Sequence, residues 1–223
     1  MGSISELLSG NSLHKEILTT AGDLATEEKL PAYVVGGYVR DMLLGHSSHD
    51  IDIMVEGDGI AFAKKLAAKL GVDITVDYDT FGTALIPHPE LEIEVASARK
   101  EKYEPDSRKP KVTHTTVEED MSRRDFTINA IAASILPDDF GKLYDPFNGL
   151  KDLQKGLIIT PMDPDETFSD DPLRMLRAVR FGAQLKYEVA PTTLDSITRN
   201  VDRLTIISWE RIRDEVIKSL KTD

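Results

Sequence analysis

The chain has 223 residues, 40% of them hydrophobic, a formal net charge of −12 and no cysteine. This length allows one large or two small domains, and the lack of cysteine excludes disulfides and thiolate metal sites. The negative charge argues against a protein that coats nucleic acid with a broadly basic surface. Any metal must be bound by carboxylates or by the five histidines, which favours hard ions such as magnesium. No segment approaches the roughly 20 apolar residues that cross a bilayer, so we expect a cytoplasmic protein with no membrane partner.

Apolar spacing and the positions of glycine and proline predict the elements of the first 100 residues. Helices are expected at residues 14–30, 38–44 and 60–70. Strands are expected at residues 32–35, 50–55, 73–76, 82–86 and 91–96. The fold class is therefore α+β, with helices flanking a mixed sheet.

The segment from Arg99 to Thr116 is polar, contains Pro105 and Pro110, and has no periodicity that could bury a face. We expect a mobile loop here. It directly follows the strand that carries Glu94, which would place the loop at the rim of a site built on that strand.

From residue 171 onward the pattern of the sequence is helical. Its two apolar repeats are Leu173, Leu176, Val179 and Phe181, and Trp209, Ile212, Val216 and Leu220. We divide the chain into a head of residues 1–150 and an all-helical neck of residues 151–223. Because the helical layer ends abruptly, we expect the neck to be the start of a larger all-α region.

Two glycines, Gly36 and Gly37, follow the first predicted strand, and Arg40 lies on the next predicted helix. Glycines let backbone amides approach a phosphate without obstruction by a Cβ atom, and a helix amino terminus adds partial positive charge. Arg40 can neutralise a phosphate from the same helix. The alternative interpretation is an ordinary Gly-Gly turn.

Asp50 and Asp52 alternate with apolar residues on a predicted strand, so their side chains point to the same side. Two carboxylates this close favour a cation between them. Two metal ions held by such a pair can activate a 3′ hydroxyl and stabilise a departing pyrophosphate. Glu94 offers a third carboxylate on another strand, with Glu92 on the same face as the competing choice. The alternative is a pair of surface acids at a strand end.

Arg123, Arg124 and Asp125 are adjacent in the chain. Together they offer charge-assisted donors for a triphosphate and an acceptor for ribose hydroxyls. The alternative is the basic start of a helix with a local ion pair.

A helix that begins near Asp171 places Asp171, Arg174 and Arg177 on one polar face, whereas Leu176 and Val179 turn inward. A fork of guanidinium donors beside a carboxylate acceptor can present fixed hydrogen-bond edges to a base. The alternative is an amphipathic helix with an arginine face.

Two segments carry a resemblance to a known superfamily. VVGGYVRDMLLG, residues 34–45, and HDIDIMV, residues 49–55, are similar to the first motif of the nucleotidyltransferases of the DNA polymerase β superfamily. Within that superfamily, MSRRDFTINA, residues 121–130, resembles the second motif of the class II CCA-adding enzymes and bacterial poly(A) polymerases.

Three further segments extend the resemblance to the same family. Residues 145–153 and 171–181 are similar to its third and fourth motifs, and residues 208–213 resemble the start of the fifth. One departure is Asp170, which stands where the family usually has Glu. The match runs from about Tyr33 to Leu220, nearly the whole chain.

The resemblance implies a template-independent RNA nucleotidyltransferase that adds C and A residues from CTP and ATP to the 3′ end of tRNA, with two Mg²⁺ ions and release of pyrophosphate. It implies that Asp50, Asp52 and Glu94 are catalytic, and that Asp50 and Asp52 bind the metal. The nucleotide-binding residues that it implies are Gly36, Gly37, Arg40, Arg124, Asp125, Asp171, Arg174, Arg177 and Arg180. Among these, Asp171 and Arg174 would select the base, so that the protein acts as the template.

Several alternatives to full CCA addition stay open. The head is shared with bacterial poly(A) polymerases, and with enzymes that add only C or only the terminal A. The long polar segment from Arg99 to Thr116 argues against a C-only enzyme, because such enzymes of this family look loop-shortened. A non-catalytic RNA-binding remnant would have no need of both Asp50 and Asp52. A small-molecule nucleotidyltransferase would have no need of the arginine helix at Arg174.

Overall fold

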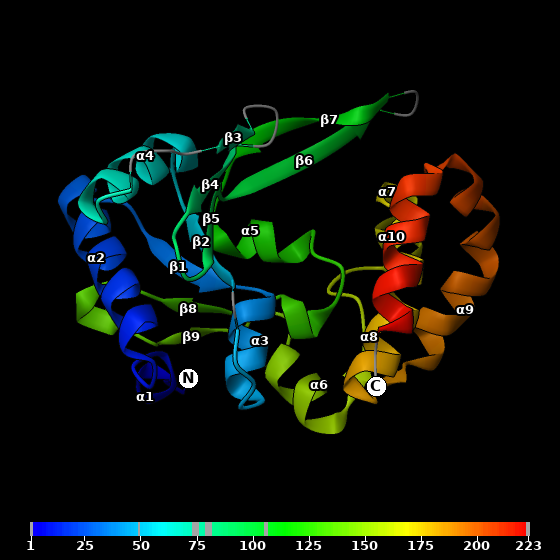
Figure 1. The fold of residues 1–223 in the computed structure, drawn as a ribbon. Helices are drawn as coiled ribbons and strands as arrows, with labels where there is room; N and C mark the ends of the chain where they lie inside the picture. The colour runs from blue at the N-terminus through cyan, green and yellow to red at the C-terminus, as the bar shows by residue number, and fades with distance from the viewer. Residues whose placement is uncertain (1, 49, 73–75, 79–81, 105–106, 222–223) are drawn as a thin grey trace. The chain divides into compact units, whose positions relative to one another are not determined.

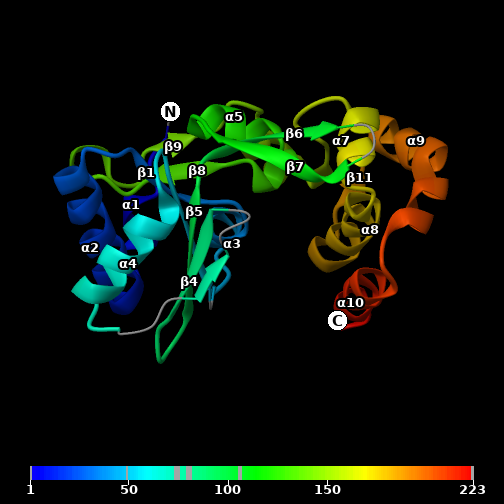
Figure 2. The same ribbon diagram turned by 90° about the horizontal axis from the view of Figure 1, so that it is seen from above.

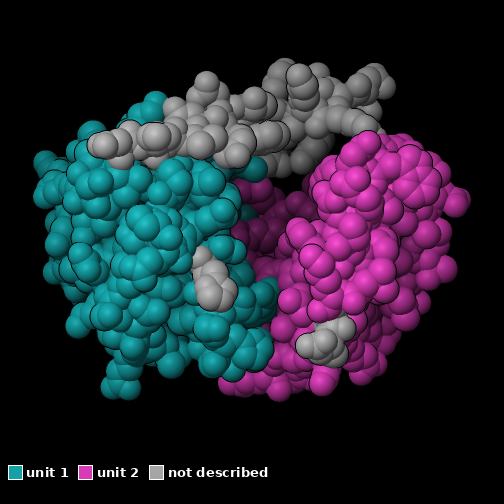
Figure 3. All heavy atoms as spheres, in the orientation of Figure 1, with its two compact units in different colours: residues 1–121, 131–146 teal, residues 122–130, 147–223 magenta. Residues whose placement is uncertain are grey.

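The computed structural model describes residues 2–48, 50–72, 76–78, 82–104 and 107–221 (Figure 1). The chain forms two compact units. Unit 1 comprises residues 1–121 and 131–146, and unit 2 comprises residues 122–130 and 147–223 (Figure 3). The head and neck boundary at residue 150 stays a prediction, and the segment 122–130 that precedes it groups with unit 2. Among the described helices, none is long and apolar enough to cross a membrane.

Unit 1 is built on a mixed sheet with the strand order β3-β4-β5-β2-β1-β8-β9. Its strands are β1 (Ala32–Val35), β2 (Asp50–Val55), β3 (Val76–Tyr78), β4 (Thr83–Pro87), β5 (Glu92–Ser97), β8 (Ala132–Ser134) and β9 (Leu143–Tyr144). β2 and β5 run parallel, and the other neighbouring pairs run antiparallel. The expected strands at 32–35 and 50–55 are confirmed without displacement, and those at 82–86 and 91–96 are displaced by one residue. Most of the strand expected at 73–76 lies outside the described residues.

Helices cover this sheet. They are α1 (Ser5–Leu8), α2 (Ser12–Glu28), α3 (Gly37–Leu43), α4 (Gly59–Lys69) and α5 (Val117–Ser122), with a 3₁₀ turn, η3 (Pro137–Asp139). α2 and α4 pack side by side, and α3 lies on the other side of β4 and β5 from α4 (Figure 2). The three predicted helices are confirmed, each beginning one or two residues earlier than expected. α2 begins there because the side chain of Asn11 accepts hydrogen bonds from the backbone amides of Leu13 and His14.

The structure corrects the expectation of an irregular loop from Arg99 to Thr116. This segment contains β6 (Arg99–Glu104) and β7 (Ser107–His114), which pair antiparallel as a separate two-stranded sheet. Apolar periodicity does not reveal such a hairpin, because backbone hydrogen bonds between two strands need no buried face. Pro110 is tolerated because it lies opposite a register shift in β6 and faces no second neighbouring strand.

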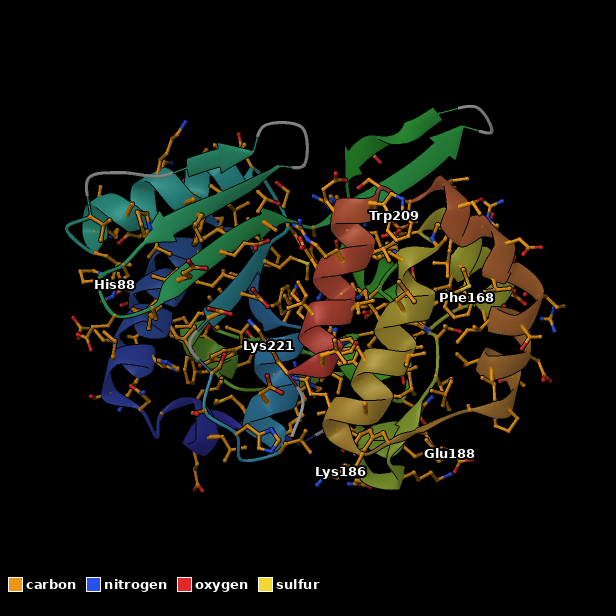
Figure 4. The ribbon with its side chains drawn as sticks, turned by 45° about the vertical axis from the view of Figure 1, so that its right-hand side comes forward. His88, Phe168, Lys186, Glu188, Trp209 and Lys221 are labelled. Atoms are coloured by element: carbon orange, nitrogen blue, oxygen red, sulfur yellow. The ribbon has the colours of Figure 1, made fainter. Side chains whose placement is uncertain are left out.

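Unit 2 is predominantly helical. Its elements are η2 (Thr127–Asn129), α6 (Gly149–Lys155), β10 (Leu157–Ile158), α7 (Pro164–Asp170), α8 (Leu173–Leu185), β11 (Glu188–Val189), α9 (Pro191–Asn200), η4 (Val201–Ile206) and α10 (Trp209–Leu220). The segment 122–130 is tied into this unit because Thr127 donates from its hydroxyl to Asp152 at 2.7 Å and from its amide to Ile159 at 2.8 Å. Phe168 is fully buried in α7, whereas Trp209 is 80% exposed at the start of α10 (Figure 4).

The predicted inward face of α8 needs a correction. Val179 was expected to turn inward but is 58% exposed. The buried stripe of the helix instead passes through Met175, Ala178 and Phe181, which are three residues apart. A residue one position after Ala178 is rotated by about 100° around the helix axis, away from that stripe. Phe181 packs edge to face against Phe126, with ring centroids 5.9 Å apart, and this contact fixes which face is buried.

Candidate nucleotidyltransferase site

The turn between β1 and α3 contains the two predicted phosphate-binding glycines. Gly36 has φ 68° and ψ −130°, a conformation that a residue with a Cβ atom rarely adopts. Its amide donates to the carbonyl of Ile131 at 3.0 Å. Arg40 is buried, and its guanidinium donates to both carboxylate oxygens of Asp41 at 2.9 and 3.0 Å. A phosphate at this turn would therefore meet an arginine that is already paired with a carboxylate.

The predicted catalytic carboxylates lie on two neighbouring parallel strands. Asp50 is paired in register with Glu92, and Asp52 with Glu94. The residues that alternate with them, such as Ile51, are fully buried on the opposite face. The register thus places four carboxylates in a two-by-two array on one face, with about 4.8 Å between the strands. The sheet places Glu94 opposite Asp52. Glu92 lies on the same face as Glu94, as the sequence predicted.

This array has the donor chemistry of a hard divalent cation, because its side chains offer only carboxylate oxygens. Within the described part of the chain, no group of three or more acidic or histidine side chains is arranged to hold a metal ion. Binding a cation would require these carboxylates to adjust their rotamers, which is possible for exposed side chains such as Asp50 and Glu94.

The predicted ribose acceptor, Asp125, is buried in unit 2 and pairs with Arg177. The guanidinium of Arg177 donates to Oδ2 of Asp125 from Nε at 2.8 Å and from Nη2 at 2.6 Å. The other oxygen accepts from the amide of Phe126 at 2.8 Å and from the side chain of Asn129 at 3.0 Å. These four donors match the roughly four lone-pair positions of a carboxylate. A ribose hydroxyl that donates to Asp125 would therefore have to replace one of these four donors or share a carboxylate oxygen with it.

The charge state of this pair follows from its surroundings. Burial raises the pKa of Asp125, but the Arg177 guanidinium and the hydrogen bond from Asn129 more than offset this, and the pKa lies below its ordinary value. Burial likewise lowers the pKa of Arg177, while the charge of Asp125 raises it above its ordinary value. Both groups are therefore ionised at neutral pH.

The predicted base-reading residues are also engaged within unit 2. Arg174 donates to the carbonyl of Arg123 at 2.7 Å and to that of Thr167 at 3.3 Å. Asp171 follows α7 in an extended conformation and accepts from the amide of Leu173 at 3.2 Å. Its second oxygen accepts from Arg211 at 2.9 Å. Arg174 thus links α8 to the segment 122–130, which carries both Arg123 and Asp125.

Arg180 was predicted to bind nucleotide, and the structure places it in the interior. Its Nε donates to Glu215 on α10 at 2.7 Å, its Nη1 donates to Gln184 at 3.0 Å, and its guanidinium lies 4.1 Å from the centre of the Phe181 ring. Glu215 and Arg211, which contact the predicted site residues from α10, were missed by the sequence analysis. Their spacing of four residues, which puts them on one side of a helix, is the signal that could have found them.

The two units divide the predicted site residues between them. Unit 1 contains Gly36, Gly37, Arg40, Asp50, Asp52 and Glu94. Unit 2 contains Arg124, Asp125, Asp171, Arg174, Arg177 and Arg180. Within each unit the predicted residues come from neighbouring elements, and their assigned roles stay predictions.

A carboxylate array beside a glycine turn, on a mixed sheet followed by helices, defines the nucleotidyltransferase fold class. Residues 32–159 match the family model of the poly A polymerase head domain, and residues 186–223 match that of the probable RNA and SrmB-binding site of polymerase A. The first match covers more than half of the chain. The chain therefore belongs to the poly(A) polymerase and CCA-adding enzyme family, as the motifs indicated.

Curated relatives carry names from tRNA processing. The chain is 41% identical over 192 residues to an A-adding tRNA nucleotidyltransferase of Aquifex aeolicus, covering 86% of this chain and 23% of that protein. It is 42% identical over 196 residues to a CCA-adding enzyme of Ligilactobacillus salivarius, covering 87% of this chain and 46% of that protein. The chain thus spans at most about half the length of these relatives.

Solved structures of similar proteins have the same fold. An apo form of a CCA-adding enzyme superposes with a TM-score of 0.88 at 36% identity, covering all of this chain and 53% of that one. A tRNA nucleotidyltransferase complexed with a primer tRNA and an incoming ATP analog superposes with a TM-score of 0.79 at 38% identity, covering 91% of this chain and 56% of that one. The predicted fold class is thereby confirmed. Nucleotidyltransferases of this kind normally use divalent metal ions.

Proposed function

We propose that this chain is the nucleotidyl-transferring part of an enzyme that completes the CCA end of tRNA, using CTP and ATP and releasing pyrophosphate. The observation that carries the proposal is the array in which Asp50 and Asp52 face Glu92 and Glu94 across parallel strands, in a chain that belongs to this family. An activity of this kind needs clustered carboxylates to hold divalent cations near a triphosphate.

Two Mg²⁺ ions, when bound, would lower the pKa of an attacking 3′ hydroxyl and balance the charge of the departing pyrophosphate. Asp50 and Asp52 would hold them, and Glu94 lies next to Asp52 on the adjoining strand. Gly36 and Gly37 would bring backbone amides close to the triphosphate. The tRNA 3′ end is the proposed acceptor, and the cytoplasmic location of this reaction stays a prediction.

In unit 2, the arginines and Asp125 would bind the nucleotide. Arg124 would contact phosphate and Asp125 the ribose, whereas Asp171 and Arg174 would present hydrogen-bond edges to the base. Arg174 is supported for this role because its guanidinium is held by two backbone carbonyls, which fixes its direction. A fixed donor fork is what selection of a base without a nucleic-acid template requires.

A second candidate is an enzyme that adds only the terminal A. It is favoured by the names of three similar relatives, from Aquifex aeolicus, Geobacter sulfurreducens and Halalkalibacterium halodurans, each an A-adding tRNA nucleotidyltransferase. The geometry of Asp50 and Asp52 serves both activities equally, so the number of nucleotides added has to be measured.

The test uses the full-length protein with three tRNA substrates that end before the CCA sequence, after the first C and after the second C. Each is incubated with labelled CTP, with labelled ATP, or with both. CCA addition predicts extension of all three to the same end. Extension of only the substrate ending in CC, with ATP alone, would establish the A-adding alternative. Continued addition of A would indicate a poly(A) polymerase, and no incorporation at all would refute the proposal.

A further inference from the structure

The hairpin of β6 and β7 leaves the rest of unit 1 at a short joint (Figures 1 and 2). In the part of the chain that the structure describes, its two strands pair with each other and with no strand of the seven-stranded sheet. A single two-stranded ribbon has little stability of its own, so its base must be held if it is to keep one direction. The residues that hold the joint therefore decide where the hairpin points.

Backbone hydrogen bonds tie both ends of the hairpin to the strands of the proposed catalytic face. The amide of Ala98, the last residue before β6, donates to the carbonyl of Val55 at the end of β2 at 2.8 Å. The amide of Thr115, the first residue after β7, donates to the carbonyl of Ala98 at 3.0 Å. The base of the hairpin therefore continues directly from β2 and β5, the strands that carry the four carboxylates.

Two further carboxylates reinforce this joint. Glu56 directly follows β2, and its Oε1 accepts from the amide of Val117, the first residue of α5, at 2.8 Å. Asp120, three residues further along α5, accepts from the amide of Arg99, the first residue of β6, at 3.2 Å. Asp120 is 1% exposed, and Glu56 is partly buried. Through these two contacts, α5 links the end of β2 to the start of the hairpin.

The contact of Glu56 satisfies one of the amides at the start of α5 that have no partner within the helix. Removing the side chain of Glu56 takes this acceptor away, which lets α5, and Asp120 with it, move relative to β2. Asp58 makes the same kind of contact to a different helix, since it accepts from the amide of Ala61 in the first turn of α4 at 3.0 Å. The two acids therefore differ in the helix that each one holds.

We propose that Glu56 is a positioning residue that fixes the direction of the β6–β7 hairpin relative to the carboxylates of β2 and β5, with α5 and Asp120 as the connecting elements. Glu56 lies four positions after Asp52, about 13 Å further along the chain at the rise of a strand, so it acts on the site through the hairpin and not by contact. The part of the inference that concerns the reaction rests on the proposed function.

The distance between two spin labels tests the joint without any assay of activity. One label is placed at Ala68, an exposed residue of α4, and the other at Lys109 on β7, in the full-length protein. The 223 residues contain no cysteine, so two introduced cysteines define the label positions within them, and any cysteine outside them is replaced by serine. We expect one narrow distance distribution for the wild type. For Glu56→Ala we expect a distribution at least about twice as broad, because a hydrogen bond to a charged acceptor is lost.

Three further variants show whether the contact of Glu56 is responsible. Asp58→Ala is the matched control, because it removes an equivalent acceptor from α4 and should leave the distribution narrow. Glu56→Gln keeps an oxygen that can accept from Val117 and should restore most of the wild-type distribution. Val117→Pro removes the donor instead, since proline has no N–H and is tolerated at the first position of a helix.

Val117→Pro should broaden the distribution as Glu56→Ala does, and it is the second variant if Glu56→Ala does not fold. A distribution that stays narrow in these two variants would overturn the proposal. Equal broadening by Asp58→Ala would also overturn it, because the effect would then be a general loss of stability. A wild-type distribution as broad as that of Glu56→Ala would show that the joint does not fix the hairpin.

Addition of the terminal A tests whether Glu56 acts on the reaction through the hairpin. Glu56→Ala is compared with the wild type on a tRNA that ends in CC, in the intact protein and in one whose residues 102–111 are replaced by Asn-Gly. In the intact protein we expect the rate to fall about 10-fold. In the shortened protein it should fall by less than about 2-fold, because two changes that act through the same element are not additive.

Equal falls in both backgrounds would overturn the link from Glu56 through the hairpin to the reaction. A wild type that transfers no nucleotide would refute the proposed function and, with it, this link. The label distances would in that case still decide whether Glu56 fixes the hairpin, so the failure of one proposal is distinguished from the failure of the other.

Discussion

Asp125 and Arg177 lie 52 positions apart in the chain and form an ion pair in which two guanidinium donors share one carboxylate oxygen. The pair joins the segment 122–130 to α8, so it fastens together two of the regions predicted to bind nucleotide. Because Asp125 is buried and all its acceptor positions are used inside the protein, the pair has a structural role whether or not a nucleotide is bound.

The variant Asp125→Asn should therefore destabilise the protein. The amide has a single oxygen: if that oxygen accepts from Phe126 and Asn129, its NH2 group faces the donors of Arg177, and in the flipped orientation a neutral oxygen faces Arg177 while the NH2 group faces the other two donors. We expect the free energy of unfolding to fall by about 2–4 kcal/mol. Denaturant unfolding of purified protein measures this change. Asp214→Asn, which removes an exposed carboxylate from α10, should have a smaller effect, and equal effects of the two variants would contradict the prediction.

The same pair makes stability depend on pH in the acid range. The pKa of Asp125 is lower in the folded protein than its ordinary value, so the unfolded chain binds a proton first as pH falls. The stabilisation is fully present above about pH 4 and is lost as pH falls through the folded-state pKa. The difference in unfolding free energy between wild type and Asp125→Asn should therefore be constant from pH 7 to 5 and shrink below pH 4. A difference that stays constant down to pH 3 would show that the pair does not carry this dependence.

The strands of the proposed catalytic face could be predicted closely from the sequence. Asp50 to Val55 alternates acidic and apolar residues before a continuous apolar end, and one register on the sheet buries Ile51 and Ile53. The partner strand was displaced by only one residue. What the sequence could not supply was the pairing of β2 with β5, because strand order is set by packing between distant parts of the chain. The opposition of Asp52 and Glu94 is therefore a result of the fold.

Two features could not be predicted, for different physical reasons. The β6–β7 hairpin is paired through its backbone, so a periodicity of apolar side chains does not mark it. The burial of Arg180, which was predicted to bind nucleotide, could not be foreseen because a single sequence does not show which acid will neutralise an arginine. Its partner Glu215 lies 35 residues away, and only the packing of α10 on α8 brings the two together.

Asp52→Ala should abolish nucleotide transfer while the protein stays folded. The variant removes one of four carboxylates from the same face, so it relieves like-charge repulsion and leaves the buried Ile51 and Ile53 in place. We expect incorporation of labelled nucleotide to fall at least about 100-fold. Glu90→Ala, an exposed acid just before β5, is the control and should keep full activity. Retention of more than a few per cent of wild-type incorporation by Asp52→Ala would mean that the metal-binding role is wrongly assigned.

Arg174→Ala should weaken the discrimination between CTP or ATP and the other two nucleotides. Arg174 is held by the carbonyls of Arg123 and Thr167, which gives it a direction that a base could read. Loss of the arginine donors weakens binding of the correct base by about 1.5–3 kcal/mol, and weakens binding of a base that does not match these donors by less. We therefore expect the ratio of kcat/KM for CTP over UTP, or for ATP over GTP, to fall roughly 10-fold. An unchanged ratio would exclude base selection by Arg174.

The final prediction concerns the hairpin formed by β6 and β7. The register pairs Glu101 with Val112, so residues 102–111 can be replaced by Asn-Gly and the strands still closed by a tight turn. The base of the hairpin should survive, because the amide of Arg99 donates to Asp120 and the amide of Val117 to Glu56.

We expect this shortened protein to add C at nearly the wild-type rate and to lose most of its addition of the terminal A. The hairpin follows β5, the strand that carries Glu94, so it can reach a nucleotide bound near that strand, while the shortening leaves Asp50, Asp52 and Arg174 in place. Product lengths on a tRNA lacking CCA, with CTP alone and with both nucleotides, measure the two steps separately. Equal loss of both additions would indicate that the hairpin serves substrate binding in general, and an unchanged product would show that it has no part in the change from C to A.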